Sequence, residues 1–128
     1  MGISLDVTPL IDRLCDAVSA RRERNRKICG EALKCIRDER LNFERIVAKK
    51  PYGKNPLERK ARTEYSFEIL GEAMRKLTRV RKFRRDAEEL KNLCEQELRR
   101  PDDEREAAEV LALITKLAPR LAASVNVI

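Results

Sequence analysis

The predicted fold depends on residues 51–56, which read Pro-Tyr-Gly-Lys-Asn-Pro and interrupt an otherwise helix-prone chain of 128 residues. Between Pro9 and this stretch there is no proline, and apolar residues recur in steps of three and four. Thr8 is a suitable helix cap and is followed by proline at the first helical position. We therefore predict a helix over 9–49 and a turn over 51–55.

A second helix is predicted over 56–100. Asn55 is a suitable cap with a glutamate three residues after it, and an apolar stripe then continues without another proline. Pro101 and the acidic residues that follow it favour a third helix over 101–118, because proline and acids are both favoured in a first turn. Pro119 is expected to kink or end that helix.

These helices predict an all-α fold. Two long helices joined by a six-residue turn must run antiparallel. We expect residues 1–128 to form a single helical domain, a long antiparallel hairpin with a shorter third helix packed at its base. This is a three-helix bundle with a coiled-coil arm, in which residues near 5–20 belong to the base and the arm projects to the turn. The same pairing places Cys35 beside Gly71.

The composition excludes several classes of function. The chain has no histidine, so it has no Ser-His or Cys-His dyad and no imidazole metal ligand. It contains no glycine-rich phosphate loop, nucleophile elbow or metalloprotease motif. We therefore predict that the protein is not an enzyme and has no catalytic residues, no metal site and no cofactor.

The four cysteines are irregularly spaced, and no export signal precedes them. We expect reduced, mostly buried thiols in an intracellular protein, either cytoplasmic or nuclear. The hairpin places Cys15 near Cys94, as a reduced pair in the core in preference to a disulfide. No stretch approaches 18 consecutive apolar residues, so no transmembrane segment is expected.

Basic residues are concentrated in two segments of a chain that has 29 Lys and Arg against 22 Asp and Glu. Residues 21–27 carry five bases and one acid, and residues 75–85 carry seven bases and no acid. The hairpin places both segments at one level, where they form what we call the basic collar. Its expected anion-binding residues are Arg21, Arg22, Arg24, Arg26, Lys27, Arg75, Arg79, Arg81, Lys82, Arg84 and Arg85.

Such a collar has two interpretations. Basic runs on long helices are usually solvated faces. Two basic segments that face each other, however, repel within the monomer, and an anionic partner would relieve that repulsion. Arginine makes up 19 of the 29 bases and suits bidentate contacts with phosphate or carboxylate, which fits nucleic acid, an anionic membrane or an acidic protein. No motif for sequence-specific nucleic-acid recognition is present.

A second apolar line makes the hairpin wider than a two-helix seam requires. We predict that a further helix packs on this line, and that it comes from the same chain if the third helix reaches far enough, from a second copy, or from another protein. The predicted protein-interface residues are Leu33, Ile36, Phe43, Phe67, Leu70 and Met74.

Together these features predict a non-enzymatic helical interaction or adaptor subunit of a larger assembly. The apolar line would contact another protein or a second copy, and the basic collar would contact an acidic protein surface or nucleic acid. The alternative is an RNA- or DNA-binding protein that contacts phosphates without sequence-specific readout, with an affinity that falls steeply with salt.

Overall fold

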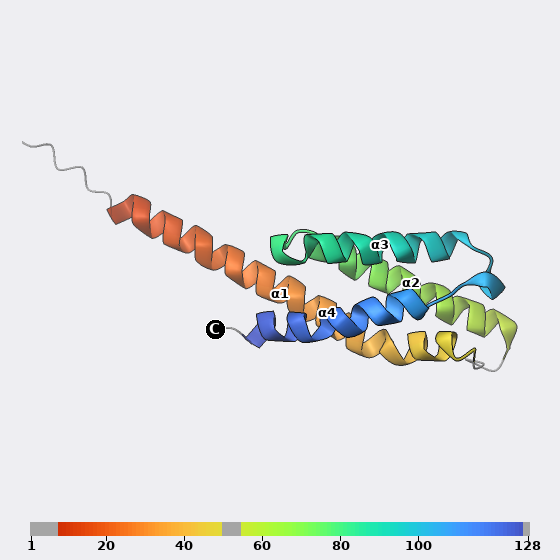
Figure 1. Ribbon diagram of the computed structural model, residues 1–128. Coiled ribbons are helices and arrows are strands. Elements are labelled where there is room, and N and C mark those ends of the chain that lie inside the picture. Colours follow the sequence, from red (N-terminus) through yellow and green to blue (C-terminus); the bar gives the residue numbers. More distant parts are fainter. Residues whose placement is uncertain (1–7, 50–54, 127–128) are drawn as a thin grey trace, which may run out of the picture.

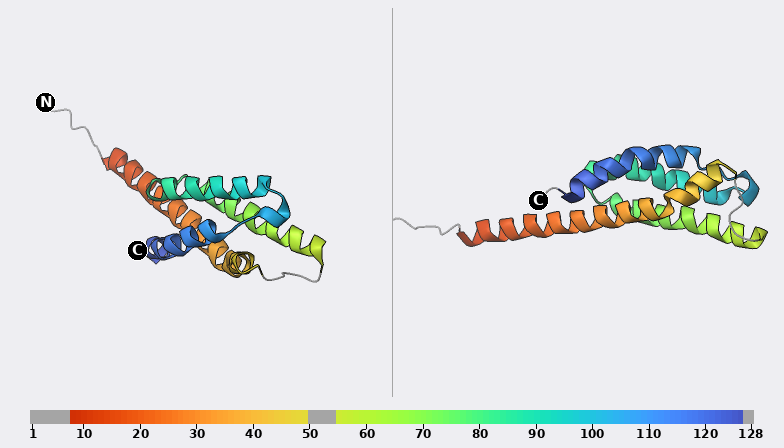
Figure 2. Two further views of the ribbon diagram at one scale, coloured as in Figure 1. Left: turned by 45° about the vertical axis from the view of Figure 1, so that its right-hand side comes forward. Right: turned by 90° about the horizontal axis from the view of Figure 1, so that it is seen from below.

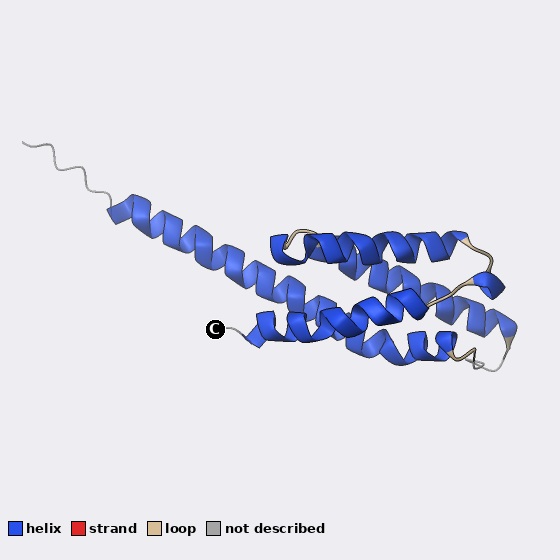
Figure 3. Ribbon diagram, in the orientation of Figure 1, coloured by secondary structure: helices blue, strands red, loops and turns tan. Residues whose placement is uncertain are grey.

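The computed structural model describes residues 8–49 and 55–126 and is helical nearly throughout (Figure 3). In chain order its elements are α1 (Thr8–Val47), α2 (Pro56–Leu77), the 3-10 helix η1 (Arg81–Phe83), α3 (Arg84–Arg99), the 3-10 helix η2 (Asp102–Glu104) and α4 (Ala108–Asn126). Neither described range contains a strand. The predicted all-α class is confirmed.

Consecutive α-helices run in opposite directions and lie side by side (Figures 1 and 2). α1 contacts α2 and α4, whereas α3 packs mainly on α2 and also on α4. All four contribute to one buried apolar cluster. Four packed helices therefore replace the predicted long hairpin with a short third helix.

The ends of the first two helices follow local rules. The Asn55 side chain accepts a hydrogen bond from the Glu58 backbone nitrogen at 2.8 Å, and proline begins α2, as the cap prediction requires. After α1, Lys49 adopts a left-handed conformation with φ 54°, which ends the helical path. Residues 51–54 of the predicted turn lie outside the described residues.

The predicted continuous helix over 56–100 is wrong, because the chain reverses at residues 78–83. Val80 is extended there, with φ −93° and ψ 110°. Arg84 Nε then donates a hydrogen bond to the carbonyl oxygen of Thr78 at 3.0 Å, which fastens the two sides of the turn. Packing of α3 on α2 follows from this reversal.

Charge and burial together account for the reversal. A continuous helix would place the seven bases of 75–85 on adjacent turns, where like charges three and four residues apart repel. The turn interrupts that spacing and directs Val80 and Phe83 into the core, where they are 6% and 1% exposed. Neither proline nor glycine occurs between 75 and 85, so no local breaker marks the position.

Because of this reversal, the residues predicted to form a protein interface lie in the core instead, so that prediction is wrong. Its six residues are between 0% and 6% exposed in the core of this chain: Leu33, Ile36, Phe43, Phe67, Leu70 and Met74. Of the three predicted sources for a covering helix, the same chain supplies it, because α3 and α4 share this core. Burying a large apolar side chain contributes about 1.5–3 kcal/mol. Six such burials outweigh a few backbone hydrogen bonds lost at the turn, at about 1 kcal/mol each.

The last helix begins and ends later than the predicted range of 101–118. An extended residue at Arg105 follows η2, and α4 starts only at Ala108. Pro119 does not end the helix, which continues to Asn126. Pro119 lies on the exposed side, whereas Leu121 is fully buried and anchors the following turn in the core.

α1 projects far beyond the other helices at its N-terminal end (Figure 1). Every residue from 8 to 24 is exposed, and we call this segment, about 25 Å long, the N-terminal extension. For residues 8–20, the described part of the range, the prediction that residues near 5–20 belong to a three-helix base is therefore wrong. So is the predicted buried pair of Cys15 and Cys94, since Cys15 is exposed in the extension and Cys94 is fully buried.

Candidate anion-binding site

The two segments of the basic collar meet at a pocket of about 590 Å³ where α1 leaves the bundle. The turn between α2 and α3 and the end of α4 lie beside α1 at this level (Figures 1 and 2). The pocket is lined by Arg22, Asn25, Arg26 and Cys29 of α1, Val80, Lys82 and Phe83 of the turn, and Ser124 of α4. Three cationic side chains therefore share a cavity with buried apolar residues.

All eleven predicted anion-binding residues are exposed, but their surroundings differ. Arg22, Arg26 and Lys82 line the pocket. Arg75 instead pairs with acids, since its guanidinium lies 3.5 Å from Glu72 and 4.0 Å from Glu95. Arg84 fastens the turn, as described above. The other six lie on α1, in the turn and at the start of α3: Arg21, Arg24, Lys27, Arg79, Arg81 and Arg85.

Asn25 supplies an unsatisfied polar group at the pocket. Its Oδ1 atom is buried and has no hydrogen-bond partner among the described residues. A buried polar atom without a partner costs about 1–3 kcal/mol. A side-chain amide offers both an acceptor oxygen and two N–H donors, so it can bind either kind of polar group. Only a group that donates a hydrogen bond to Oδ1, such as a backbone N–H of a bound segment, would remove the cost.

The cationic side chains of the pocket lie next to buried apolar side chains. Burial raises the pKa of the Cys29 thiol, and the nearby charge of Lys82 opposes that rise. Lys82 Nζ lies 5.6 Å from the centre of the Phe83 ring, and Arg120 Cζ lies 5.4 Å from it, both within the range of cation–π attraction. Such a site suits an anion that carries an apolar group.

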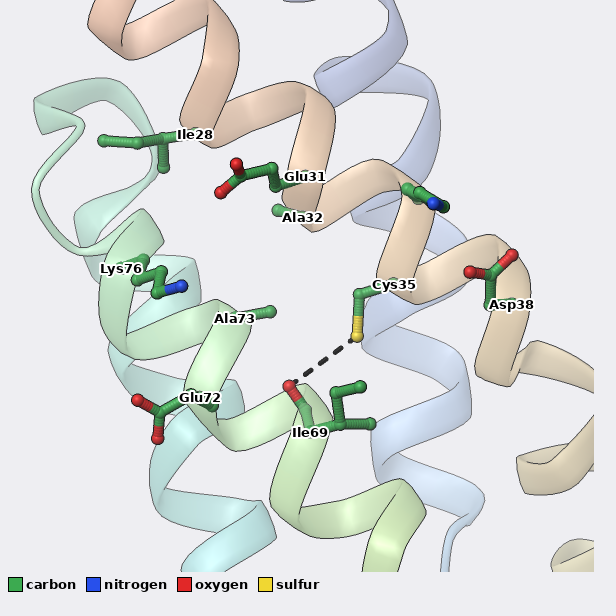
Figure 4. A pocket seen from close by; sticks show the side chains of 10 residues that line it. Ile28, Glu31, Ala32, Cys35, Asp38, Ile69, Glu72, Ala73 and Lys76 are labelled. Atoms are coloured by element: carbon green, nitrogen blue, oxygen red, sulfur yellow. Dashed lines mark hydrogen bonds between the residues drawn. The ribbon is translucent and has the colours of Figure 1, made fainter.

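A second pocket, of about 330 Å³, lies between α1 and α2 (Figure 4). Its lining mixes acidic and basic side chains, and the Cys35 thiol points across it to the carbonyl oxygen of Ile69 at 3.7 Å. Burial, followed by the charges of Glu39 and Asp38, raises the pKa of Cys35 to about 12. The thiol therefore stays protonated near neutral pH and is a poor nucleophile.

Sequence reasoning missed the contribution of α4 to the candidate site. Ser124 lines the pocket and Arg120 packs on the Phe83 ring, but both lie beyond the predicted helix end at residue 118. The available signal was the spacing of Leu121, four residues after Leu117 and on the same apolar face.

The described part of the chain offers neither a metal cluster nor a membrane span. No three of its cysteine, aspartate or glutamate side chains are grouped so that they could hold a metal ion. Within residues 8–49 and 55–126, every helix is too short or too polar to cross a membrane.

Comparison with known proteins gave no match: no family model, no curated protein and no solved structure resembles this chain. Function is therefore inferred from the residues of the chain itself.

Proposed function

We propose that this protein is a non-enzymatic interaction subunit that binds an acidic protein segment at the basic collar. The proposal depends on one observation, the convergence of Arg22, Arg26 and Lys82 on a pocket with an apolar floor. Arginine binds carboxylates through two parallel hydrogen bonds, and lysine adds a point charge. An apolar side chain of the same segment would enter the pocket and pack beside Val80 and Phe83.

Two details favour a binding site over a solvated basic face. Like charges from α1 and from the α2–α3 turn are held around one cavity, where they repel each other in the absence of an anion. The Asn25 Oδ1 atom is also buried at this position with no partner among the described residues. A surface with no ligand would gain nothing from either arrangement.

The second candidate is a protein that contacts nucleic-acid phosphates. It is favoured by a separate observation, the seven bases without an acid in residues 75–85, of which Arg79, Arg81 and Arg85 are exposed around the turn. Contacts of this kind read charge and not base sequence. They make affinity fall steeply as salt displaces the protein from the phosphates.

The two candidates are separated by direct binding measurements. Fluorescence anisotropy would compare a labelled glutamate-rich peptide containing one phenylalanine with a single-stranded RNA of equal charge, at about 50 and 200 mM salt. We expect the peptide to bind, and the triple variant Arg22→Ala, Arg26→Ala, Lys82→Ala to bind it at least tenfold more weakly.

A matched triple variant supplies the control. Arg40→Ala, Arg99→Ala and Lys116→Ala remove the same charge from exposed positions outside the collar and should leave the affinity within about twofold. Tighter binding of the RNA with a steep salt dependence would favour the nucleic-acid candidate. Absence of binding to either probe would identify the collar as a solvated face.

A further inference from the structure

The N-terminal extension carries an apolar stripe that nothing in the described structure covers. Leu10 is 60% exposed, Ile11 52%, Leu14 66% and Val18 49%. The extension projects beyond the ends of the other helices (Figure 1). Four large apolar side chains on one face of a projecting helix form a surface that is costly to leave in water.

This stripe continues the core-facing side of α1. Its residues repeat in alternating steps of three and four, which is the a and d pattern of a coiled coil. The a and d positions in order are Ile11, Leu14, Val18, Arg21, Asn25, Ile28 and Ala32. Ile28 and Ala32 are buried against the bundle, at 8% and 1% exposed. The extension thus has the pattern of a coiled-coil strand, without a partner strand in the described part of the chain.

We propose that this partner strand is the N-terminal extension of a second copy, paired antiparallel. An antiparallel pair brings a positions of one helix against d positions of the other. When Leu14 faces the partner's Val18 and Ile11 faces the partner's Arg21, the pairing is centred at residue 16. That is also the middle of the exposed segment 8–24. Both extensions then overlap over their full exposed length, and neither reaches into the other's bundle.

The distribution of charge along the extension favours the antiparallel over the parallel orientation. Residues 8–20 carry two acids and one base, whereas residues 21–27 carry five bases and one acid. A parallel pair would place the two basic segments side by side, where they repel. In the antiparallel pair centred at residue 16, Arg22 lies opposite the partner's Leu10 and Arg24 opposite the partner's Thr8, both uncharged, and the partner's Asp12 lies two residues from the level of Arg22. The aliphatic part of Arg21 covers the partner's Ile11 while its guanidinium stays in water.

The expected contact is small. Two helices overlapping over about 25 Å fall in the class of interfaces below about 1,200 Å², which are reversible. We therefore expect a monomer–dimer equilibrium in the micromolar range. The proposal does not depend on the anion-binding function, because the apolar stripe contains none of the residues that line the pocket; Arg22 is the one pocket residue that lies within the paired segment.

Analytical ultracentrifugation of the full chain over a range of concentrations tests the pairing. We expect reversible dimers in the wild type and monomers in the variant Leu14→Asp, Val18→Asp, with an unchanged melting temperature because both positions are exposed. The matched variant Leu41→Asp, Leu57→Asp changes two exposed leucines elsewhere, at 56% and 80%, and should still dimerise. A monomeric wild type at high micromolar concentration would overturn the proposal, as would a dimer unaffected by the Leu14 and Val18 changes.

Spin labels determine the orientation. With Cys15 replaced by Ser and Arg24→Cys labelled, the two labelled backbones should lie about 24 Å apart along the paired helices, since residue 24 sits opposite residue 8. A parallel pair would place them side by side and would contradict the proposal. A last experiment tests whether the chain binds vesicles of anionic lipid. A monomeric chain that binds them through Leu14 and Val18 would show that a lipid surface, and not a second copy, covers the stripe.

Discussion

Replacing Arg105 should destabilise the bundle more than replacing an exposed arginine. Its side chain is only 6% exposed and fastens the connection between α3 and α4. Arg105 Nε donates to the carbonyl oxygen of Glu97 at 3.0 Å, and Nη2 donates to that of Leu98 at 3.3 Å. Nη1 lies 3.1 Å from Asp102 Oδ1 and 3.5 Å from Glu64 Oε1. One guanidinium thus caps α3, holds η2 and reaches α2.

The size of the effect follows from these contacts. A hydrogen bond to a charged group contributes about 1.5–3 kcal/mol, and bonds made by one side chain do not add fully. We expect Arg105→Ala to lower the free energy of unfolding by about 3 kcal/mol. That is a large share of the roughly 5–15 kcal/mol typical of a domain. Arg105→Lys keeps the charge but not the planar fork, and should recover less than half of the loss.

Urea unfolding followed by circular dichroism measures the effect. Arg105→Ala should lower the midpoint without changing the dependence on urea, since the surface exposed on unfolding is the same. Arg99→Ala removes an exposed arginine from the same end of α3 and should cost less than about 0.5 kcal/mol. Equal midpoints for the Arg105→Ala and Arg99→Ala variants would refute the reasoning.

Two further predictions concern the packing of α2 on α3. Gly71→Ala should raise the free energy of unfolding by about 0.8–1 kcal/mol, because alanine favours helix more than glycine does. The added Cβ would lie 3.6 Å from the Cys94 Cβ, which is an ordinary van der Waals contact. A lower melting temperature of this variant would show that the close packing of the two helices requires glycine. Burial, and then the charges of Cys35, Glu95 and Glu97, raises the pKa of Cys94 from 9.0 to about 12, so the folded chain keeps a proton that the unfolded chain releases. Its stabilising contribution is complete below pH 9 and is lost as the pH rises toward 12, by up to about 1.4 kcal/mol per pH unit. Urea titrations should therefore show a shallower alkaline loss in Cys94→Ala than in the wild type, and identical slopes would refute the assignment.

Local signals in the sequence were sufficient for the helix class and for some helix ends. The Asn55 cap and Pro56 fix the start of α2 through contacts within four residues. The antiparallel packing of α1 on α2 also follows from the turn, and it brings Cys35 close to Ile69, near the predicted level of Gly71. For the same reason, the predicted level at which the two basic segments meet agrees with the pocket formed by Arg22, Arg26 and Lys82.

The reversal at 78–83 could not be predicted by the same means. α2 carries two apolar lines, and periodicity favoured the one that includes Leu57 and Tyr65, which are 80% and 49% exposed. The line through Phe67 and Leu70 forms the core instead, because α3 and α4 are available to cover it. That choice depends on contacts between helices far apart in the chain. No proline or glycine marks it locally.

The polar interruption of the α1 stripe explains why the fold has both a bundle and an extension. Arg21 and Asn25 occupy a and d positions between the exposed Val18 and the buried Ile28. An arginine at such a position resists burial, because removing its charge from water is costly. Coverage of α1 by the turn and by α4 therefore ends at these residues, and the apolar segment before them stays available to another chain. The collar pocket forms at the same boundary, where cationic side chains can reach water from the end of the core. One pair of polar residues thus separates the surface used for folding from the surfaces that we propose for binding.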